Sequence, residues 1–172
     1  MNAAPTIGDK RSRDLAERLQ RAATEVKEPR CSRVVHAFAK TVFVSHTSVD
    51  DEFIKGTDEK IGPAVTGSIL WLVGIKFPDP FYHSRKTGGA QAYERIVGLA
   101  LLSSTRVVIV WSENALRSDC VRAEILIATK GQRKLGVYMM PGAPPFPIAG
   151  VELVHDSVGL GQMLDSWKDT ER

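Results

Sequence analysis

The chain has 172 residues, of which 43% are hydrophobic and 25% charged, a composition typical of one soluble globular domain. No apolar run approaches the roughly 20 residues that span a bilayer, and the first residues lack the apolar core of a secretory signal. The two cysteines, Cys31 and Cys120, have no metal-type spacing, which argues against a disulfide framework and favours a reducing cytosol. We therefore expect a cytoplasmic protein.

The net charge of +3 is unevenly distributed along the chain. Residues 1–40 hold nine Lys/Arg and five Asp/Glu, whereas the remainder is nearly balanced. A basic N-terminal helix is able to contact nucleic acid or an anionic lipid surface. Because acids are interleaved with the bases, a solvated helix face is the favoured interpretation, and we expect neither a nucleic-acid nor a membrane partner.

The N-terminal part divides into a tail and a helix. Residues 1–12 are expected to be disordered, and apolar residues from Asp14 to Val26 recur at helical spacing, with Pro29 marking the end. We expect two regions, residues 1–39 as a tail with an amphipathic helix and residues 40–172 as the main domain.

The main domain alternates between strand and helix patterns. We expect strands at Thr41–Val44, Ile75–Phe77, Val107–Trp111, Leu135–Met139 and Val151–Val154. Between and after them we expect the start of a helix at Val49–Ile54 and helices at Ala64–Val73, Ala90–Leu102, Ser118–Lys130 and Val158–Trp167. Loops are expected up to Gly89 and at Pro141–Pro147. This alternation predicts an α/β fold with a doubly wound parallel sheet of about five strands. Ligands of such sheets bind beyond the carboxyl ends of the strands, where loops begin at Ser45, Pro78 and Ser112.

One acid has an unusual setting. On the helix after Trp111, the neighbours of Glu124 three and four residues away are Cys120, Val121, Ile127 and Ala128, none of them charged. Burying an unpaired carboxylate is costly, so we expect Glu124 to be buried or at the rim of a pocket, with a partner from another element.

Three segments in this order resemble a TIR (Toll/interleukin-1 receptor) domain. Val42-Phe43-Val44-Ser45-His46 resembles the first strand and its exit, Asp79 to Tyr93 with Gly88-Gly89 resembles the long loop after the second strand, and Val107 to Ser112 followed by Ser118-x-x-Val121-x-x-Glu124 resembles the third strand and helix. The resemblance covers about Lys40 to Trp167 and implies a flavodoxin-like fold.

The resemblance implies one of two roles. Some TIR domains are interaction scaffolds, and others cleave the nicotinamide–ribose bond of NAD⁺ to give ADP-ribose or a cyclic isomer, with the acid that matches Glu124 as the catalytic residue. The motifs are more similar to prokaryotic members, which commonly serve in antiphage defence. The resemblance also implies self-association through the loop Asp79–Gly89 and a downstream effector protein, with NAD⁺ as substrate and no cofactor or metal.

One position departs from the family pattern. Enzymatic members usually carry Trp four residues before the acid, as a wall of the nicotinamide pocket, and here that residue is Cys120. Trp111, Tyr82 or Tyr93 are the candidates to replace its stacking area. The departure favours the scaffold alternative, whereas the apolar setting of Glu124 favours the enzyme.

The remaining candidate residues surround the same edge. Ser45 and His46 follow the first strand and are able to contact phosphate or ribose, and Tyr82 and His83 are candidates for substrate or for contacts between domains. Ser118 is the expected helix N-cap and a further candidate for substrate binding. We expect Arg122 to pair with Asp119 on the solvent-facing side of the helix.

The chemistry needs only one acid. Nicotinamide leaves as a neutral molecule, and a carboxylate near the ribose stabilises the developing oxocarbenium-like charge. A nucleoside deoxyribosyltransferase-like enzyme, which shares the sheet type and a glutamate, is a third alternative whose motifs fit less well. A receiver domain is disfavoured because its first strand should end in an aspartate, and this one ends in Ser45.

Overall fold

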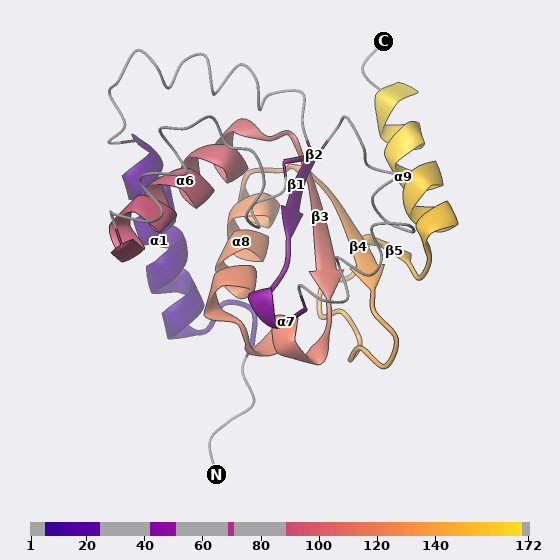
Figure 1. Ribbon diagram of the computed structural model, residues 1–172, viewed down its shortest axis with the longest axis horizontal. Helices are drawn as coiled ribbons and strands as arrows, with labels where there is room; N and C mark the ends of the chain where they lie inside the picture. Colours follow the sequence, from indigo (N-terminus) through magenta and orange to yellow (C-terminus); the bar gives the residue numbers. More distant parts are fainter. Residues whose placement is uncertain (1–5, 25–41, 51–68, 71–88, 170–172) are drawn as a thin grey trace.

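The computed structural model describes residues 6–24, 42–50, 69–70 and 89–169, and these residues form an α/β fold (Figure 1). Four strands, β1 (Val42–Ser45), β3 (Arg106–Trp111), β4 (Lys134–Met139) and β5 (Glu152–Val154), make a parallel sheet. A two-residue strand, β2 (Ile69–Leu70), pairs with β1 at the edge, so the strand order is β2-β1-β3-β4-β5. The order reverses direction between β1 and β3, which is where doubly wound sheets bind ligands.

Both faces of the sheet are covered, as its strands require. Strands such as Val107–Val110 are apolar at every position and are buried throughout. Alternate side chains point to opposite faces, so Val107 and Ile109 pack beneath α8, whereas Val108 and Val110 pack beneath α9. Figure 1 shows α1, α6 and α8 on one side and α9 on the other.

The described helices follow the expected order closely. They are α1 (Lys10–Thr24), α6 (Gly89–Ser103), α7 (Glu113–Arg117), α8 (Asp119–Lys130) and α9 (Ser157–Asp169), with a 3-10 turn η1 (Ser48–Asp50) after β1. No helix among the described residues is long and apolar enough to cross a membrane. The short helix α7 occupies part of the stretch after Trp111 that was expected to be loop.

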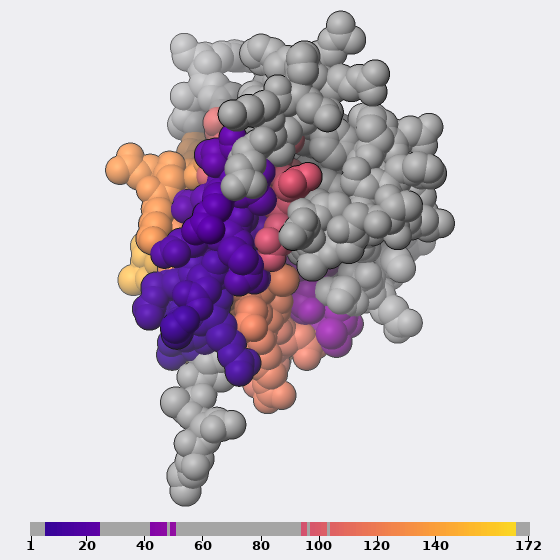
Figure 2. Space-filling view, turned by 90° about the vertical axis from the view of Figure 1, so that its left-hand side faces the viewer, coloured from indigo at the N-terminus to yellow at the C-terminus, as the bar shows by residue number. Residues whose placement is uncertain are grey.

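Helix α1 belongs to the same core as the main domain. Its apolar stripe, including Leu15 and Leu19, is buried against α6 and α8. A Cβ added to Gly98 of α6 would lie only 2.2 Å from the carbonyl oxygen of Leu19, so the two helix backbones approach too closely for any side chain there. In the space-filling view α1 is a ridge along this face of the molecule (Figure 2).

Arg133, just before β4, ties together the ends of two helices. Its guanidinium donates hydrogen bonds to the carbonyl oxygens of Leu101, Leu102 and Ser104 at the end of α6, at 3.0 to 3.1 Å. A further bond of 3.3 Å reaches the carbonyl oxygen of Ile127 in α8. Since the last carbonyl groups of a helix lack partners within it, a cation at this position stabilises both ends.

Two further expectations about the course of the chain were wrong. Residues 69–70 lie within the stretch expected to be a helix, but they form an edge strand, because the apolar run there has no helical periodicity. Residues 1–12 were expected to be disordered, but a turn at residues 7–8 leads into α1 at Lys10. The expected strand at residues 75–77 and nearly all of the loop Asp79–Gly89 lie outside the described residues.

Candidate functional site

The site is built around the first half of α8. Ser118 caps the helix, with its hydroxyl accepting a hydrogen bond from the backbone N–H of Val121 at 3.3 Å. Glu124 follows between two apolar turns and is only 4% exposed. Both the N-cap and the burial of the acid agree with what the sequence predicts. The helix therefore carries its carboxyl group into the interior, on the face that meets the sheet.

Glu124 has a polar partner from β1. The hydroxyl of Ser45, the last residue of that strand, donates a hydrogen bond to Oε2 of Glu124, and both groups are buried. Among the described residues no cation forms an ion pair with Glu124. The structure thus brings together two of the predicted site residues at the carboxyl edge of the sheet.

The surroundings of Glu124 change its acidity. Burial raises the pKa of this carboxyl group to about 8, and the hydrogen bond from Ser45 lowers it by a smaller amount. The charged form is disfavoured because it loses water without gaining a counter-charge from the described residues. At pH 7 the ligand-free chain therefore holds Glu124 mainly in its neutral form. A strongly raised pKa at the ligand-binding edge of a sheet is a common property of functional acids.

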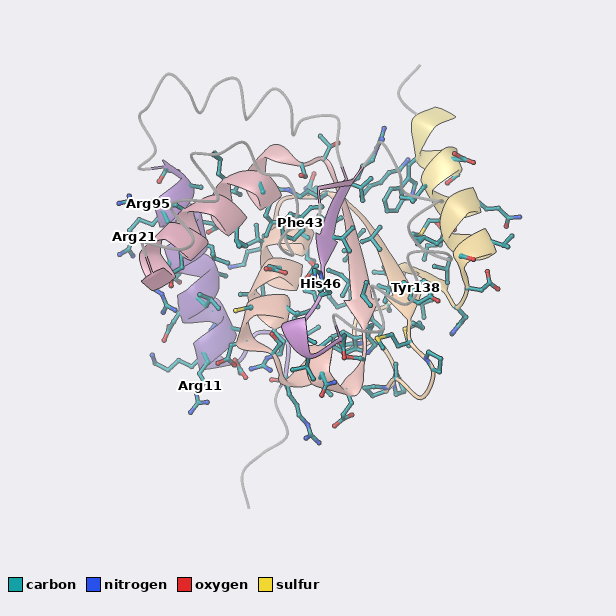
Figure 3. The ribbon with its side chains drawn as sticks, in the orientation of Figure 1. Arg11, Arg21, Phe43, His46, Arg95 and Tyr138 are labelled. Carbon is teal, nitrogen blue, oxygen red and sulfur yellow. The ribbon has the colours of Figure 1, made fainter. Side chains whose placement is uncertain are left out.

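His46 lies beside this pair. Figure 3 shows Phe43 on β1 and His46 beyond the carboxyl end of the strand, near η1. His46 is half-buried, and its Nδ1 is 3.4 Å from the carbonyl oxygen of Val44. The residue is thus at the switch point of the sheet, next to Ser45, where the sequence placed it.

A second buried carboxylate lies at the same edge and was missed by the sequence analysis. Asp50 in η1 is 5% exposed and accepts hydrogen bonds from the Ser112 hydroxyl at 2.6 Å and from the Asn114 side-chain amide at 2.9 Å. Ser112 in turn accepts from the N–H of Ala115 and caps α7. These bonds join the exits of β1 and β3. The sequence does contain a signal for the partners of Asp50, because the polar residues Ser112 and Asn114 follow directly after the central strand.

Trp111 is packed in the core at the end of β3. Its ring is fully buried, its Nε1 donates a hydrogen bond to the carbonyl oxygen of Pro144 at 2.8 Å, and it meets Phe146 edge to face at 5.0 Å. The indole thereby holds the proline-rich loop against the sheet. A ring with no exposed face offers no surface to a ligand in this conformation, and its contact with substrate stays a prediction.

The remaining candidates differ in how the structure places them. Cys120 is half-buried, one turn before Glu124, and packs against the core beneath α8. Tyr93 lies in α6, but its side chain is outside the described part. Tyr82 and His83 lie outside the described residues. Within the described residues no group of three or more His, Cys, Asp or Glu side chains is arranged to hold a metal ion.

Arg122 was expected on the solvent-facing side of α8, and the structure corrects this expectation. It pairs with Asp119 at 2.5 Å as predicted, but its side chain is 2% exposed and does not face solvent. The physical reason is α1, which covers this side of α8 and contributes Asp9, whose Oδ2 lies 3.0 Å from Arg122 Nη2. Arg122 also donates to the carbonyl oxygen of Leu116 at 2.6 Å.

A separate cavity lies beyond the ends of β4 and β5. Its volume is about 330 Å³, and its lining is Met139, Met140, Pro141, Gly142, Ala143 and His155. None of the site residues predicted from the sequence lines it. The cavity is at the carboxyl edge of the sheet but is lined by other loops than those beside the Glu124–Ser45 pair.

No family model, curated protein or solved structure matches this chain. The α/β class is shown by the parallel sheet and its flanking helices. Any function has to be argued from the chemistry of the Glu124–Ser45 pair and its surroundings.

Proposed function

We propose that this chain is a TIR-domain protein that cleaves the nicotinamide–ribose bond of NAD⁺, giving nicotinamide and ADP-ribose or a cyclic ADP-ribose isomer, in bacterial antiphage signalling. Two features support the TIR assignment. The strand order β2-β1-β3-β4-β5 is the order of flavodoxin-like doubly wound sheets. The motifs around Ser45, Ser112 and Glu124 lie on elements of the type that the resemblance requires.

The observation that carries the proposal is the position of Glu124. Its carboxyl group is buried at the carboxyl edge of a parallel sheet, and its partner among the described residues is a neutral hydroxyl, that of Ser45. An acid with a purely structural role at this depth normally has a cationic partner. Glu124 instead has no cation beside it among the described residues, so a cation that arrives with a substrate is able to pair with its ionised form.

The reaction suits a single carboxylate. The bond between the ribose C1′ and the pyridinium nitrogen breaks, and its electron pair neutralises the nicotinamide ring. Positive charge then develops on the ribose, where the negative charge of Glu124 stabilises it. Water adds at C1′ and releases one proton in hydrolysis, whereas attack by a nitrogen of the adenine base gives a cyclic isomer and likewise releases a proton.

The raised pKa of Glu124 fits a cationic substrate. The nicotinamide ring of NAD⁺ carries a positive charge, and an opposite charge within about 4–6 Å favours the ionised form of a carboxyl group. Binding of NAD⁺ therefore lowers the pKa of Glu124 from about 8 and releases its proton before the bond breaks. At neutral pH the acid is then mainly charged when a cation is present to compensate for the lost water.

Release of nicotinamide from NAD⁺ tests the proposal. Purified protein is assayed at high concentration and with a crowding agent, because TIR enzymes often need packing between domains. Glu124→Gln should abolish release while keeping the shape of the site. The matched control is Glu113→Gln, which removes an exposed glutamate paired with Arg117 on the neighbouring helix and should retain full activity. Release that persists unchanged in Glu124→Gln would refute the assignment.

The alternative is a TIR scaffold without catalysis, and Cys120 is the observation that favours it. This thiol leaves the position of the usual pocket tryptophan without an aromatic wall. A scaffold would self-associate and bind another TIR protein, and no nicotinamide would appear under any condition of assembly. Replacing Cys120 by Trp separates the two proposals, since only an enzyme gains NAD⁺ affinity from the added stacking surface.

A further inference from the structure

Helix α8 is held by polar contacts on two sides. It lies between α1 and the sheet (Figure 1), and apart from the bond of Arg133 to the Ile127 carbonyl oxygen near its end it is packed through apolar residues. Glu124 bonds to Ser45 on the side of the sheet, and Arg122 bonds to groups on the side of α1. Two residues correspond to about 200° of helical rotation, so these contacts are almost opposite each other. Because apolar packing has no preferred direction, the two contacts made by side chains of α8 define the rotation of its first two turns.

Arg122 is held by three neighbours through its two terminal nitrogens. Its Nη2 lies 3.0 Å from Asp9 Oδ2 and 2.5 Å from Asp119 Oδ1, and its Nη1 donates to the carbonyl oxygen of Leu116 at 2.6 Å. The side chain is 2% exposed, so the charge depends on these contacts for compensation. Of the two acids, Asp119 moves with α8, and only Asp9 connects the helix to another layer.

Asp9 uses its two oxygens for different purposes. Oδ1 accepts a hydrogen bond from the backbone N–H of Ser12 at 2.9 Å, which is the contact of an N-cap at the start of α1. Oδ2 pairs with Arg122. The N–H of Ser12 and, less strongly, Arg122 hold the pKa of Asp9 below its ordinary value, so the residue is charged throughout the neutral range.

The helix that carries Asp9 is itself held firmly. The close approach of Leu19 and Ala23 to Gly98 fixes α1 against α6, and Leu15 and Ala16 of α1 are buried in the core. Asp9 is therefore a fixed point relative to the sheet. A contact from a fixed point to Arg122 restrains the first two turns of α8.

We infer that Asp9 and Arg122 are positioning residues: through their ion pair, α1 fixes the rotation of α8 that brings Glu124 onto Ser45. The consequence for catalysis depends on the proposed NAD⁺ cleavage, but the consequence for the geometry of Glu124 does not. The N-terminal helix then contributes to the geometry of the site, although its residues lie on the far side of α8 from Glu124.

Asp9→Asn is the variant that tests this inference. Asparagine caps a helix as well as aspartate, so α1 keeps its N-cap while Arg122 loses the charge of its partner. The matched control is Asp14→Asn, which makes the same change on the same helix in an exposed pair with Lys10. The ionisation of Glu124 is followed directly by ¹³C NMR of its side-chain carboxyl carbon between pH 5 and 9, with Glu124→Gln identifying the signal.

A positioning role and a merely structural role give different results. If α8 rotates, Glu124 becomes better hydrated, and its titration midpoint in Asp9→Asn should fall from about 8 by roughly one pH unit or more. In Asp14→Asn the midpoint should not move. A structural role would lower the stability of Asp9→Asn and leave the midpoint where it is, and that result would overturn the inference.

Activity provides the second measurement. We expect the rate of nicotinamide release to fall about tenfold in Asp9→Asn and to be unchanged in Asp14→Asn, because a misplaced catalytic group costs rate even when it is present. If the unaltered chain releases no nicotinamide but the midpoint moves only in Asp9→Asn, the proposed function fails and the positioning role stands. Equal midpoints in both variants would refute the positioning role whatever the activity.

Discussion

The burial of Glu124 predicts an unusual dependence of stability on pH. The folded chain keeps the proton of this carboxyl group up to about pH 8, whereas the unfolded chain loses it near the ordinary value of 4.5. Between these values the folded state binds more protons than the unfolded state, so the free energy of unfolding decreases as the pH rises. The contribution is constant below pH 4.5, where both states are protonated, and constant again above pH 8.

The size of the effect follows from the same two values. Each pH unit between them is worth about 1.4 kcal/mol, which gives a loss of about 3 kcal/mol at pH 7 and about 5 kcal/mol above pH 8. A domain of this size is typically stable by about 5–15 kcal/mol, so one side chain accounts for a large part of the total. Glu124→Gln keeps the shape and removes the ionisation, and it should therefore be more stable than the unaltered chain at pH 8.

Urea unfolding at several pH values measures this difference. The free energies of the unaltered chain and of Glu124→Gln should agree within about 1 kcal/mol at pH 5 and separate steadily up to pH 8. Other titrating groups are common to both chains and cancel in the comparison. Glu113→Gln, at an exposed site, should give no such separation. Parallel profiles for Glu124→Gln and the unaltered chain would show that the carboxyl group is hydrated, and the argument from burial would fail.

Further substitutions test the packing around the site. Gly98→Ala places a methyl group 2.2 Å from the Leu19 carbonyl oxygen, so despite the better helix propensity of alanine we expect a loss of about 1–3 kcal/mol by thermal unfolding, and a rise in melting temperature would contradict the close approach. Asp50→Ala leaves the buried hydroxyl of Ser112 without its acceptor, and urea unfolding should show a loss of about 1–3 kcal/mol that Asp50→Asn partly restores. Arg133→Met removes the guanidinium from the ends of α6 and α8 and should cost about 2 kcal/mol, with faster amide hydrogen exchange at those two helix ends, whereas unchanged exchange would count against the cap.

Local patterns predict the elements and the burial of Glu124 well. The helix with apolar neighbours at three and four residues, its Ser118 cap and the apolar central strand all follow from residues close together in the chain. The sequence predicts that the partner of Glu124 comes from another element but does not identify it, because Ser45 is 79 residues away in sequence. Only the parallel pairing of β1 with β3 places that hydroxyl over α8.

The errors have the same cause. Asp50 belongs to the run Asp50-Asp51-Glu52, which is typical of a solvated surface, and its burial depends on Ser112 and Asn114 from another strand exit. Arg122 has the i,i+3 acid of an exposed helix pair, and its burial depends on Asp9, which is 113 residues away. Spacing within one element indicates which side chains share a face, but the partner of that face is set by the tertiary structure.

The close packing of α1 against Gly98 also determines where this protein can be truncated. The sequence suggests a boundary near residue 40, and a fragment that begins there would retain the five strands that the structure describes. It would also uncover the apolar sides of α6 and α8 that Leu15 and Leu19 now shield from water. Freshly exposed patches of this kind promote aggregation. A fragment intended for crystallisation or spectroscopy should therefore retain the chain from Asp9 onward.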